Sequence, residues 1–402
     1  MTALERRASG SLAAIFAARM LGLFLVLPVF ALEAARYPGG HDPSLVGLAM
    51  GIYGLTQGVL QIPFGLASDR FGRKRVIVAG LLVFAAGSFV AAAADSLAWL
   101  IVGRSLQGAG AVSAAVTALL ADQTRDEVRT KAMALVGASI GLMFALSLVA
   151  APMLAGSIGL SGLFAITGLL ALGCIAVVRW WTPAEPVQHK NLPRGRLADV
   201  LNHAPLLRLD VGVFVLHAVQ LAMWVAVPAL LVSAGLDKED HWKVYLPTIL
   251  GSFVVMGASL FPLERRGYLR AVFLGSVALI GLVQLGLLLV SPRPYVGGLA
   301  VLLFLFFCGF NVLEASQPSM ASRLAPPHAR GAALGVYNTL QSLGFFAGGA
   351  VGGWMLKHVG AQGVFGACAA LMALWLAVAW PMRAPASAKS AEETLADEAQ
   401  AT

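Results

Sequence analysis

The chain has 402 residues, of which 58% are hydrophobic and only 12% are charged. A soluble domain carries charge at about a quarter of its positions, so this composition excludes an ordinary soluble protein. The net charge of +8 does not indicate a nucleic-acid-binding protein, because the basic residues are spread over the connections between apolar segments.

Apolar segments recur along the whole sequence, and each is long enough to cross a hydrocarbon layer of about 30 Å. A backbone in lipid must satisfy its own hydrogen bonds, so these segments are expected to be helices. We therefore predict an all-α polytopic membrane protein with twelve transmembrane helices in two six-helix halves. The predicted spans are 11–33, 44–68, 75–94, 97–121, 131–155, 159–180, 208–234, 242–262, 268–290, 294–320, 330–356 and 360–382.

Basic residues gather on one side of this predicted topology. If both termini share a side, 21 of the 28 lysines and arginines lie there, five lie opposite, and Arg19 and Arg104 fall within spans. The positive-inside rule then places both termini in the cytoplasm. Cys174, Cys308 and Cys368 lie in apolar runs at unrelated spacings, so we expect no disulfide framework, no metal site and no cofactor.

A polar stretch in mid-chain divides the spans six and six. It runs from Thr182 to Arg196 and is rich in proline and charge, which is typical of a linker. The expected organisation is an N-terminal half (1–181), a cytoplasmic linker (182–207), a C-terminal half (208–383) and a disordered acidic tail (384–402). The two halves share weak sequence matches at an offset near 200. The matching positions are Pro28 and Pro228, Pro63 and Pro262, and Arg129 and Arg330. Pro63 and Pro262 are expected to end the second helix of each half. Such a parallel repeat is a transporter architecture, with substrate bound between the halves.

A charged loop follows the second predicted span, and its sequence is GLASDRFGRKR. It matches the loop 2–3 signature of the major facilitator superfamily at Gly65, Asp69, Arg70, Gly72, Arg73, Lys74 and Arg75. The segment RSLQGAG, from Arg104 to Gly110, resembles the fourth-helix pattern of the same family. The antiporter motif of the fifth helix is present in degenerate form, as Ser147, Ala151, Pro152, Ala155 and Gly156. Longer stretches resemble the YajR-type branch of proton-coupled, drug-efflux-like facilitators, without the soluble C-terminal domain that some members add.

The resemblance implies a gate at this loop. Asp69 is expected to face the N-terminal end of the eleventh helix, and Arg73 is expected to pair with Asp122. Such contacts would exist only while the cytoplasmic side is closed and would favour the outward-facing state. The simpler interpretation is an anchor on anionic lipid, in which each basic residue contributes about 1 kcal/mol.

Four ionisable residues fall within the predicted spans: Arg19, Arg104, His217 and Glu314. Such residues are costly in a membrane and are therefore functional candidates. Glu314 is the leading candidate for proton binding, coupled to His217 at a similar depth, and the alternative is a buried pair that fixes helix packing. The resemblance links Arg104 to proton coupling. We expect Arg19 to extend towards the cytoplasm.

Uncharged polar residues on several spans are expected to line a substrate cavity. Tyr53, Gln57 and Gln61 share one face of the second helix because they are four residues apart. The other candidates are Gln107, Asn311, Asn338 and Gln341. Ordinary hydrogen bonds between helices are the alternative for each. At the end of the first span, Glu33 and Arg36 are expected to form a solvated ion pair.

The sequence thus predicts a proton-coupled secondary transporter that exports small amphipathic or hydrophobic molecules by alternating access. Import of a small organic solute by proton symport or facilitated diffusion stays open as the alternative. An enzyme is not expected, because the sequence has no metal-spaced histidine cluster, phosphate-binding loop or nucleophile elbow. The expected partners are a small-molecule substrate, protons and the bilayer of a bacterial inner membrane, with no nucleic acid, and the protein is expected to be a monomer.

Overall fold

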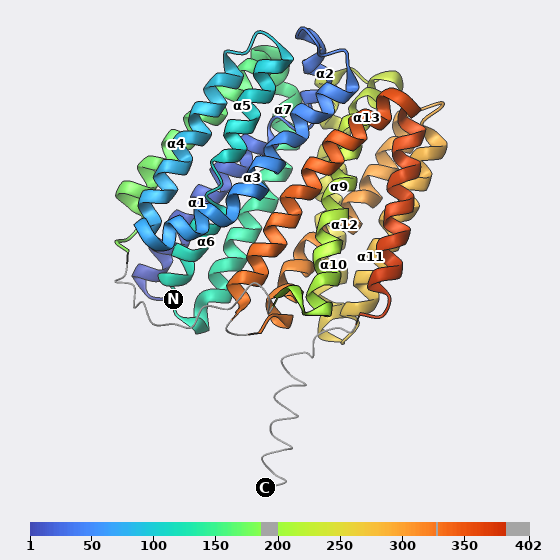
Figure 1. The fold of residues 1–402 in the computed structure, drawn as a ribbon. Coiled ribbons are helices and arrows are strands. Elements are labelled where there is room, and N and C mark those ends of the chain that lie inside the picture. The colour runs from blue at the N-terminus through green and yellow to red at the C-terminus, as the bar shows by residue number, and fades with distance from the viewer. Residues whose placement is uncertain (186–199, 327–328, 383–402) are drawn as a thin grey trace.

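The structure is a computed structural model that describes residues 1–185, 200–326 and 329–382, with only the backbone described at a few helical positions. The described residues fold into helices and connecting turns, without a β-strand (Figure 1). In Figure 1 the helices of the first half gather on the left and those of the second half on the right, and α3 and α13 meet between them. The predicted tail lies outside the described residues, as does most of the linker.

The bounds of the helices follow the chain in two series. The first half comprises α1 (Ala3–Phe24), α2 (Phe30–Glu33), η1 (Ala34–Arg36), α3 (Pro43–Phe71), α4 (Arg73–Ala92), α5 (Leu97–Ala109), α6 (Ser113–Asp122), α7 (Asp126–Ala176) and η2 (Val177–Trp181). The second half comprises α9 (Ala204–Ser233), η3 (Lys238–Asp240), α10 (Trp242–Arg265), α11 (Leu269–Val290), α12 (Val296–Leu324) and α13 (Arg330–Ala379).

Helix α7 is a hairpin of two helices. A straight helix of 51 residues would extend about 75 Å, far beyond a bilayer. At Gly159 the backbone leaves helical geometry, with φ 63° and ψ −173°, which suits a residue without a Cβ. Both ends of α7 lie beside the start of α1: Arg125 pairs with Glu5 at 2.8 Å, and Arg7 donates to the carbonyl of Trp181 at 2.7 Å. The hydrogen bonds from Arg125 lower the pKa of Glu5 to about 2, so this pair is ionised at neutral pH.

Helix α13 repeats this hairpin in the second half. Gly360 has φ 73° and ψ −177°, close to the values at Gly159. After the return, Arg270 at the start of α11 donates to the carbonyls of Trp380 and Met382. The glycines with positive φ form three pairs at an offset close to that of the sequence repeat: Gly39 with Gly235, Gly72 with Gly267, and Gly159 with Gly360. The two halves therefore bend at corresponding places.

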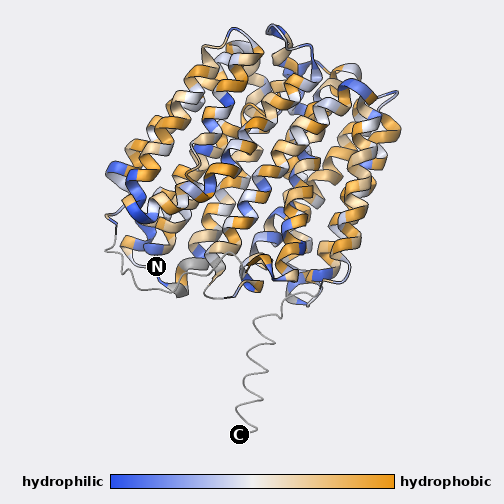
Figure 2. Ribbon diagram, in the orientation of Figure 1, coloured by the Kyte–Doolittle hydropathy of each residue, from blue (hydrophilic) through white to orange (hydrophobic). Residues whose placement is uncertain are grey.

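We call the end of the bundle that holds the start of α1 and the Gly65–Arg75 loop the motif end, and the other end the opposite end. Figure 1 shows the N-terminus at the motif end and α2 at the opposite end. Figure 2 shows hydrophilic residues concentrated at both ends and apolar residues dominating the helices between them. Large apolar side chains also face outward, such as Val254 (71% exposed) and Leu289 (78% exposed). This surface suits lipid, not water.

Eight helices of the described residues are long and apolar enough to cross a membrane, and the hairpins α7 and α13 each count as one of them. The first and fourth predicted spans are each interrupted: a turn at residues 25–29 separates α1 from α2, and residues 110–112 separate α5 from α6. At Gly110 a Cβ would lie 2.5 Å from the carbonyl oxygen of Gly80, so the break accommodates a close approach of α4. The prediction that Pro63 and Pro262 end helices is wrong, because both lie inside α3 and α10.

Glycines let the two halves meet along α3 and α13. A Cβ on Gly47 would lie 2.2 Å from the carbonyl oxygen of Gly349, and one on Gly54 would lie 2.2 Å from that of Ser342. Only residues without a side chain permit so close an approach of two helices. At Gly331 and Gly335, in the first turns of α13, a Cβ would meet no atom within 4 Å. The halves are thus packed most tightly towards the opposite end.

Two ion pairs join the halves at that opposite end. Lys238 of η3 contacts Glu33 of α2 at 2.5 Å, and Lys357 of α13 contacts Asp42, just before α3, at 2.7 Å. The hydrogen bond from Lys357 lowers the pKa of Asp42 below its ordinary value. The Glu33 carboxylate is only 2% exposed, although Arg36 also contacts it at 3.0 Å. The predicted Glu33–Arg36 pair is therefore present, but its carboxylate is buried and not solvated, and Lys238 of the second half also contacts it.

Candidate substrate and proton site between the halves

A buried arginine organises the polar groups of the first half. Arg19 of α1 is 2% exposed, and its guanidinium donates to the hydroxyls of Ser113 (2.7 Å) and Tyr53 (2.8 Å) and to Oε1 of Gln57 (3.0 Å). It also lies over the ring of Phe84, 5.5 Å from the centroid. The prediction that Arg19 extends towards the cytoplasm is wrong, because its guanidinium is buried inside the bundle, where it donates to polar side chains of α3 and α6.

A second buried arginine lies over the ring of Tyr53. Arg104 of α5 is 3% exposed and lies 5.0 Å from the centroid of the Tyr53 ring. It donates to Oε1 of Gln107 at 3.0 Å and to the main-chain carbonyls of Ala49 and Met50. Gln107 in turn donates to Ser88 of α4 at 2.8 Å. The predicted residues Arg104, Gln107 and Tyr53 therefore form one network across three helices.

The glycines of the RSLQGAG segment explain its place in this network. A Cβ on Gly108 would lie 2.2 Å from the carbonyl oxygen of Tyr53, so α5 touches the backbone of α3 there. A Cβ on Gly103 would lie 2.8 Å from the carbonyl oxygen of Gly87, so α5 also touches α4. The glycines thus bring the helices close enough for Arg104 to reach carbonyls of α3.

The leading predicted proton site of the second half is a contact of three side chains. Nε2 of His217, on α9, lies 3.2 Å from Oε2 of Glu314, on α12. Gln341 of α13 contributes its amide nitrogen, 2.8 Å from Nε2 of His217 and 3.4 Å from Oε1 of Glu314. The His217 side chain is 2% exposed, whereas that of Glu314 is 36% exposed. The structure therefore brings His217 and Glu314 into contact and leaves the carboxylate open on one side.

The hydrogen bonds of His217 determine where its proton can be. Nδ1 lies 2.8 Å from the carbonyl oxygen of Val213, which can only accept, so Nδ1 carries a proton. In the neutral ring Nε2 is then an acceptor, and it receives the hydrogen bond from Gln341. The same Nε2 lies 3.2 Å from Oε2 of Glu314, so the imidazole and the carboxylate are in direct contact.

One hydrogen bond connects the polar groups of the two halves. The amide nitrogen of Gln57, whose oxygen accepts from Arg19, donates to the hydroxyl of Ser342 on α13 at 3.0 Å. Ser342 is the neighbour of Gln341 in the chain. The Arg19 network and the Glu314 group therefore lie on the two sides of the α3–α13 contact.

The side chains of the remaining predicted cavity residues form no hydrogen bond with these groups among the described residues. Asn311 donates to Ser252 of α10 at 2.8 Å, which is a bond between helices. Gln61 is 1% exposed, and both its side-chain polar atoms lack a hydrogen-bond partner among the described residues. Asn338 is half-buried, and its main-chain carbonyl accepts from Ser342. Only some of the predicted residues therefore share one site.

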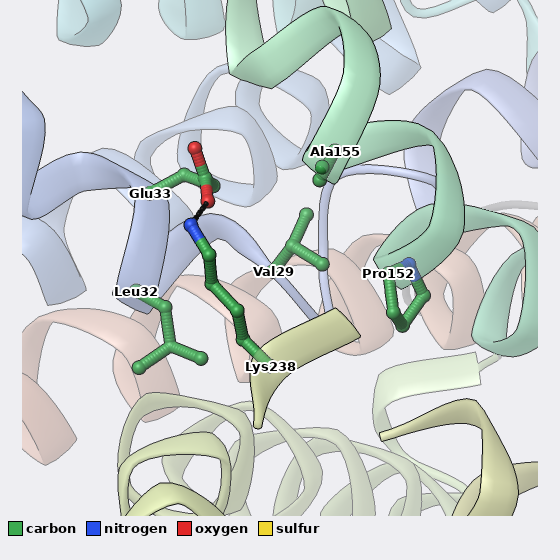
Figure 3. A pocket seen from close by; sticks show the side chains of 7 residues that line it. Val29, Leu32, Glu33, Pro152, Ala155 and Lys238 are labelled. Carbon is green, nitrogen blue, oxygen red and sulfur yellow. Dashed lines mark hydrogen bonds and ion pairs between the residues drawn. The ribbon is translucent and has the colours of Figure 1, made fainter. Parts of the chain in front are cut away.

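The hollow in Figure 3 lies at the opposite end and holds none of the predicted cavity residues. Its lining residues are Val29, Leu32, Glu33, Pro152, Ala155, Gly156 and Lys238. Figure 3 shows Lys238 reaching Glu33 beside aliphatic side chains and Pro152. The lining comes from both halves, so the hollow is a seam between them, and its two charges pair with each other. Three positions of the degenerate antiporter motif thus face this seam.

The Gly65–Arg75 loop forms a compact ionic cluster at the motif end. Arg73 pairs with Asp69 and, at 3.1 Å, with Asp122 of α6, and it donates to Ser68 at 2.6 Å. Gly72 joins α3 to α4 with φ 97°, a value that favours glycine. The expected Arg73–Asp122 contact is present. Asp69 was also expected to approach the eleventh helix, which begins at the start of α13. The side chain of Arg330 at this start lies outside the described part of the chain, so this contact stays a prediction.

Other motif residues are more exposed or contact the linker. Arg70 and Arg75 are exposed, Gly65 lies against Ala114 of α6, and the ammonium group of Lys74 donates to the carbonyl of Thr182 at 2.7 Å. The last contact shows that the loop also holds the chain that leaves the first half.

Glu185 is a functional candidate that the sequence did not indicate. Its two carboxylate oxygens accept from the backbone N–H groups of Arg73 (3.1 Å) and Lys74 (2.6 Å). It therefore caps the N-terminus of α4 from the beginning of the linker. Glu185 and Arg73 are 112 residues apart in the chain. The sequence around α4 therefore gave no signal for this contact, because a capping residue normally directly precedes its helix.

Comparison with known proteins agrees with these observations. A family model described as Major Facilitator Superfamily matches residues 12–349 and 262–400. The chain belongs to the Major Facilitator Superfamily. It is 43% identical to the inner membrane transport protein YajR of Escherichia coli, over 96% of this chain and 85% of that protein. It is 29% identical to the multidrug resistance protein MdtH of Aeromonas salmonicida, over 86% of each.

Solved structures of this superfamily share the fold. A crystal structure of an auto-inhibited peptide transporter of the POT family aligns with a TM-score of 0.74, at 14% identity, over 93% of this chain and 96% of that one. The chain is thus a membrane transporter, and the predicted family is confirmed.

Proposed function

We propose that this superfamily member is a proton-coupled secondary active transporter that exports small amphipathic or hydrophobic molecules by alternating access. The observation that carries the proposal is the contact of Glu314, His217 and Gln341 inside the bundle. A carboxylate within a membrane span is energetically costly and is therefore a functional candidate. We propose that this carboxylate takes up and releases a proton beside the histidine. We propose a transport role without enzymatic activity.

The proposed topology has twelve spans with both termini in the cytoplasm. Each of the hairpins α7 and α13 supplies two spans, and the interrupted pairs α1–α2 and α5–α6 supply one each. The excess of lysine and arginine at the motif end supports a cytoplasmic location for that end. We expect a monomer in the inner membrane of a bacterium, where the hydrophobic outer surface contacts lipid.

The proposed state of the structure is closed towards the periplasm. The α3–α13 glycine contacts and the Glu33–Lys238 pair are located at the opposite end, whereas the first turns of α13 have free space around Gly331. In this state the 36% exposed Glu314 can exchange its proton from the cytoplasmic side. The Gly65–Arg75 cluster would then be a gate component that gains its contact with the eleventh helix when the cytoplasmic side closes.

Proton coupling is tested with Glu314→Gln in proteoliposomes that carry an imposed pH gradient. Solutes of anionic, neutral and cationic character are added in turn, and collapse of the gradient is followed with an internal pH-sensitive dye. We expect wild type to respond to at least one solute class and Glu314→Gln to retain less than about a tenth of that response, because a neutral amide binds no proton.

The matched control is Glu264→Gln, which changes a carboxylate at the motif end that pairs with Arg323 at 2.8 Å. This variant should keep the wild-type response. Wild-type coupling in Glu314→Gln would refute the proposed proton site. Solute entry accompanied by protons, instead of exchange against them, would refute export and establish symport.

A further inference from the structure

The first half contains two buried guanidinium groups that have no carboxylate partner. Arg19 is 2% exposed and Arg104 is 3% exposed, yet neither forms an ion pair with any described residue. A buried charge normally has a counter-ion, because removal from water is costly. Within a membrane span the same cost makes such a residue a functional candidate.

The two arginines differ in how fully their donors are used. Each of the three guanidinium nitrogens of Arg104 has an acceptor, and two of these acceptors are main-chain carbonyls. The Nε of Arg19 is buried without an acceptor among the described residues, and its other partners are two hydroxyls and one amide. Hydroxyls can donate as well as accept, so Ser113 and Tyr53 can turn towards an anion. Arg19 is therefore the incompletely satisfied cation.

Arg19 also lies next to the surface where the halves part. Gln57 accepts from Arg19 and donates to Ser342 of the other half, so separation of α3 from α13 at this point breaks that bond. The separation would uncover Gln57 and, behind it, the guanidinium. The Glu314 group lies across the same contact, since Gln341 precedes Ser342.

We propose that Arg19, together with Tyr53, Gln57 and Ser113, is a binding site for a negatively charged group of the substrate. The transported solute would then be an organic anion with an apolar body, because a planar guanidinium binds a carboxylate or a similar oxyanion through paired hydrogen bonds. This inference rests on the proposed transport function and specifies its substrate class. A cationic solute would face the uncompensated charge of Arg19.

The test uses three naphthyl compounds that differ in the charge of one group: naphthylacetate, naphthylacetamide and naphthylethylammonium. Binding to the protein in lipid nanodiscs is measured by calorimetry, without a pH gradient. We expect wild type to bind the acetate at least about tenfold more tightly than the amide, which corresponds to 1.4 kcal/mol. The ammonium compound should bind most weakly.

Three variants and a control separate charge from folding. Arg19→Gln should reduce the affinity for the acetate to that for the amide, while Arg19→Lys should keep the preference for the anion. Ser113→Asp places a carboxylate beside the guanidinium, which Ser113 contacts at 2.7 Å, so it should supply the missing counter-ion and abolish the preference in a folded protein. Arg323→Gln changes an exposed arginine and should behave as wild type.

Equal binding of acetate and amide by wild type would overturn the inference, as would the absence of saturable acetate binding. A preference for the anion that persists in both Arg19→Gln and Ser113→Asp would also overturn it. Arg19-dependent anion binding without solute-driven proton movement in proteoliposomes would uphold this site and refute the proposed coupling. If only the ammonium compound moved together with protons, the proposed coupling would be upheld and the anion site at Arg19 would be refuted.

Discussion

At the scale of single residues, the largest corrections concern charged side chains whose partners come from distant segments. Arg19 was expected to extend towards the cytoplasm, but its guanidinium binds Tyr53, Gln57 and Ser113 of two other helices inside the first half. Glu185 likewise binds the start of α4 from the linker. Neither contact follows from helical periodicity. Periodicity indicates which residues share one face of a helix, but it does not indicate which other segment packs against that face.

The cap supplied by Glu185 leads to a prediction of stability. Replacing Glu185 by Ala removes both acceptors from the first N–H groups of α4 and should lower the free energy of unfolding by about 1 kcal/mol, as for loss of other N-cap acceptors. Thermal unfolding of the purified protein, followed by intrinsic fluorescence, provides the measurement. Asp95→Ala, at an exposed position between helices, is the control. Equal melting temperatures for the two variants would show that the cap contributes nothing.

At the scale of helices, glycine placement determines which pairs of helices can touch. The same residue type has opposite environments on α13: Gly349 approaches the backbone of α3, whereas a Cβ at Gly335 would meet no atom within 4 Å. The sequence shows only that both positions are glycine, so it could not distinguish these two environments. The distinction depends on the partner helix, which the residue type does not specify.

The α3–α13 contact is tested by adding side chains. Gly54→Val should destabilise the protein by about 1–3 kcal/mol, because the new side chain overlaps the carbonyl oxygen of Ser342 and the α3–α13 contact cannot expand without loss. Gly335→Val adds the same atoms where there is room and should change the melting temperature little. Equal destabilisation by both substitutions would contradict the packing described for this interface.

At the scale of the whole molecule, the two halves are held together at one end by two ion pairs. Glu33–Lys238 has a carboxylate that is only 2% exposed, whereas Asp42–Lys357 has side chains that are 29% and 44% exposed. Salt screens exposed pairs more effectively than buried ones. The Glu33–Lys238 pair should therefore resist salt, and the Asp42–Lys357 pair should not.

The proposed periplasmic closure predicts that loss of these pairs exposes the interior. A cysteine replacing the buried Met50 of α3, in a protein whose own cysteines are replaced, should react slowly with a maleimide. Combining it with Lys238→Ala and Lys357→Ala should increase the rate at least about tenfold, since the two substitutions remove both ion pairs that join the halves at this end. Lys243→Ala, which removes an exposed pair within one half, is the control.

Acidification should also increase the reaction rate of the cysteine at position 50, because it protonates Asp42 and weakens the Asp42–Lys357 pair. Because Lys357 lowers the pKa of Asp42 from 3.8, the closed end favours the ionised carboxylate. The stabilisation is complete above pH 3.8 and is lost as the pH falls through the lowered value, where the carboxylate is protonated.

In the maleimide experiment, an unchanged reaction rate in the variant with both Lys238→Ala and Lys357→Ala would show that the ion pairs do not keep this end closed.

Membrane helices, family and motifs followed from the sequence alone. Long apolar segments, the Gly65–Arg75 signature and the RSLQGAG pattern are local features, and hydrocarbon allows little besides a helix for such segments. The pair of Glu314 and His217 was also accessible, because rare ionisable residues at similar depth on inward-lining helices have few possible partners. The interruption near Gly110 was not accessible, since it depends on the approach of α4.

Tertiary structure alone decided which polar groups act together. It placed Arg19 beside Tyr53, paired Asn311 with Ser252 of α10, and set Glu185 against α4. It also showed that the halves meet most closely at the opposite end. The physical reason is that hydropathy fixes how a segment crosses the membrane, whereas its rotation and its neighbours are fixed by glycine contacts and buried hydrogen bonds between residues far apart in the chain.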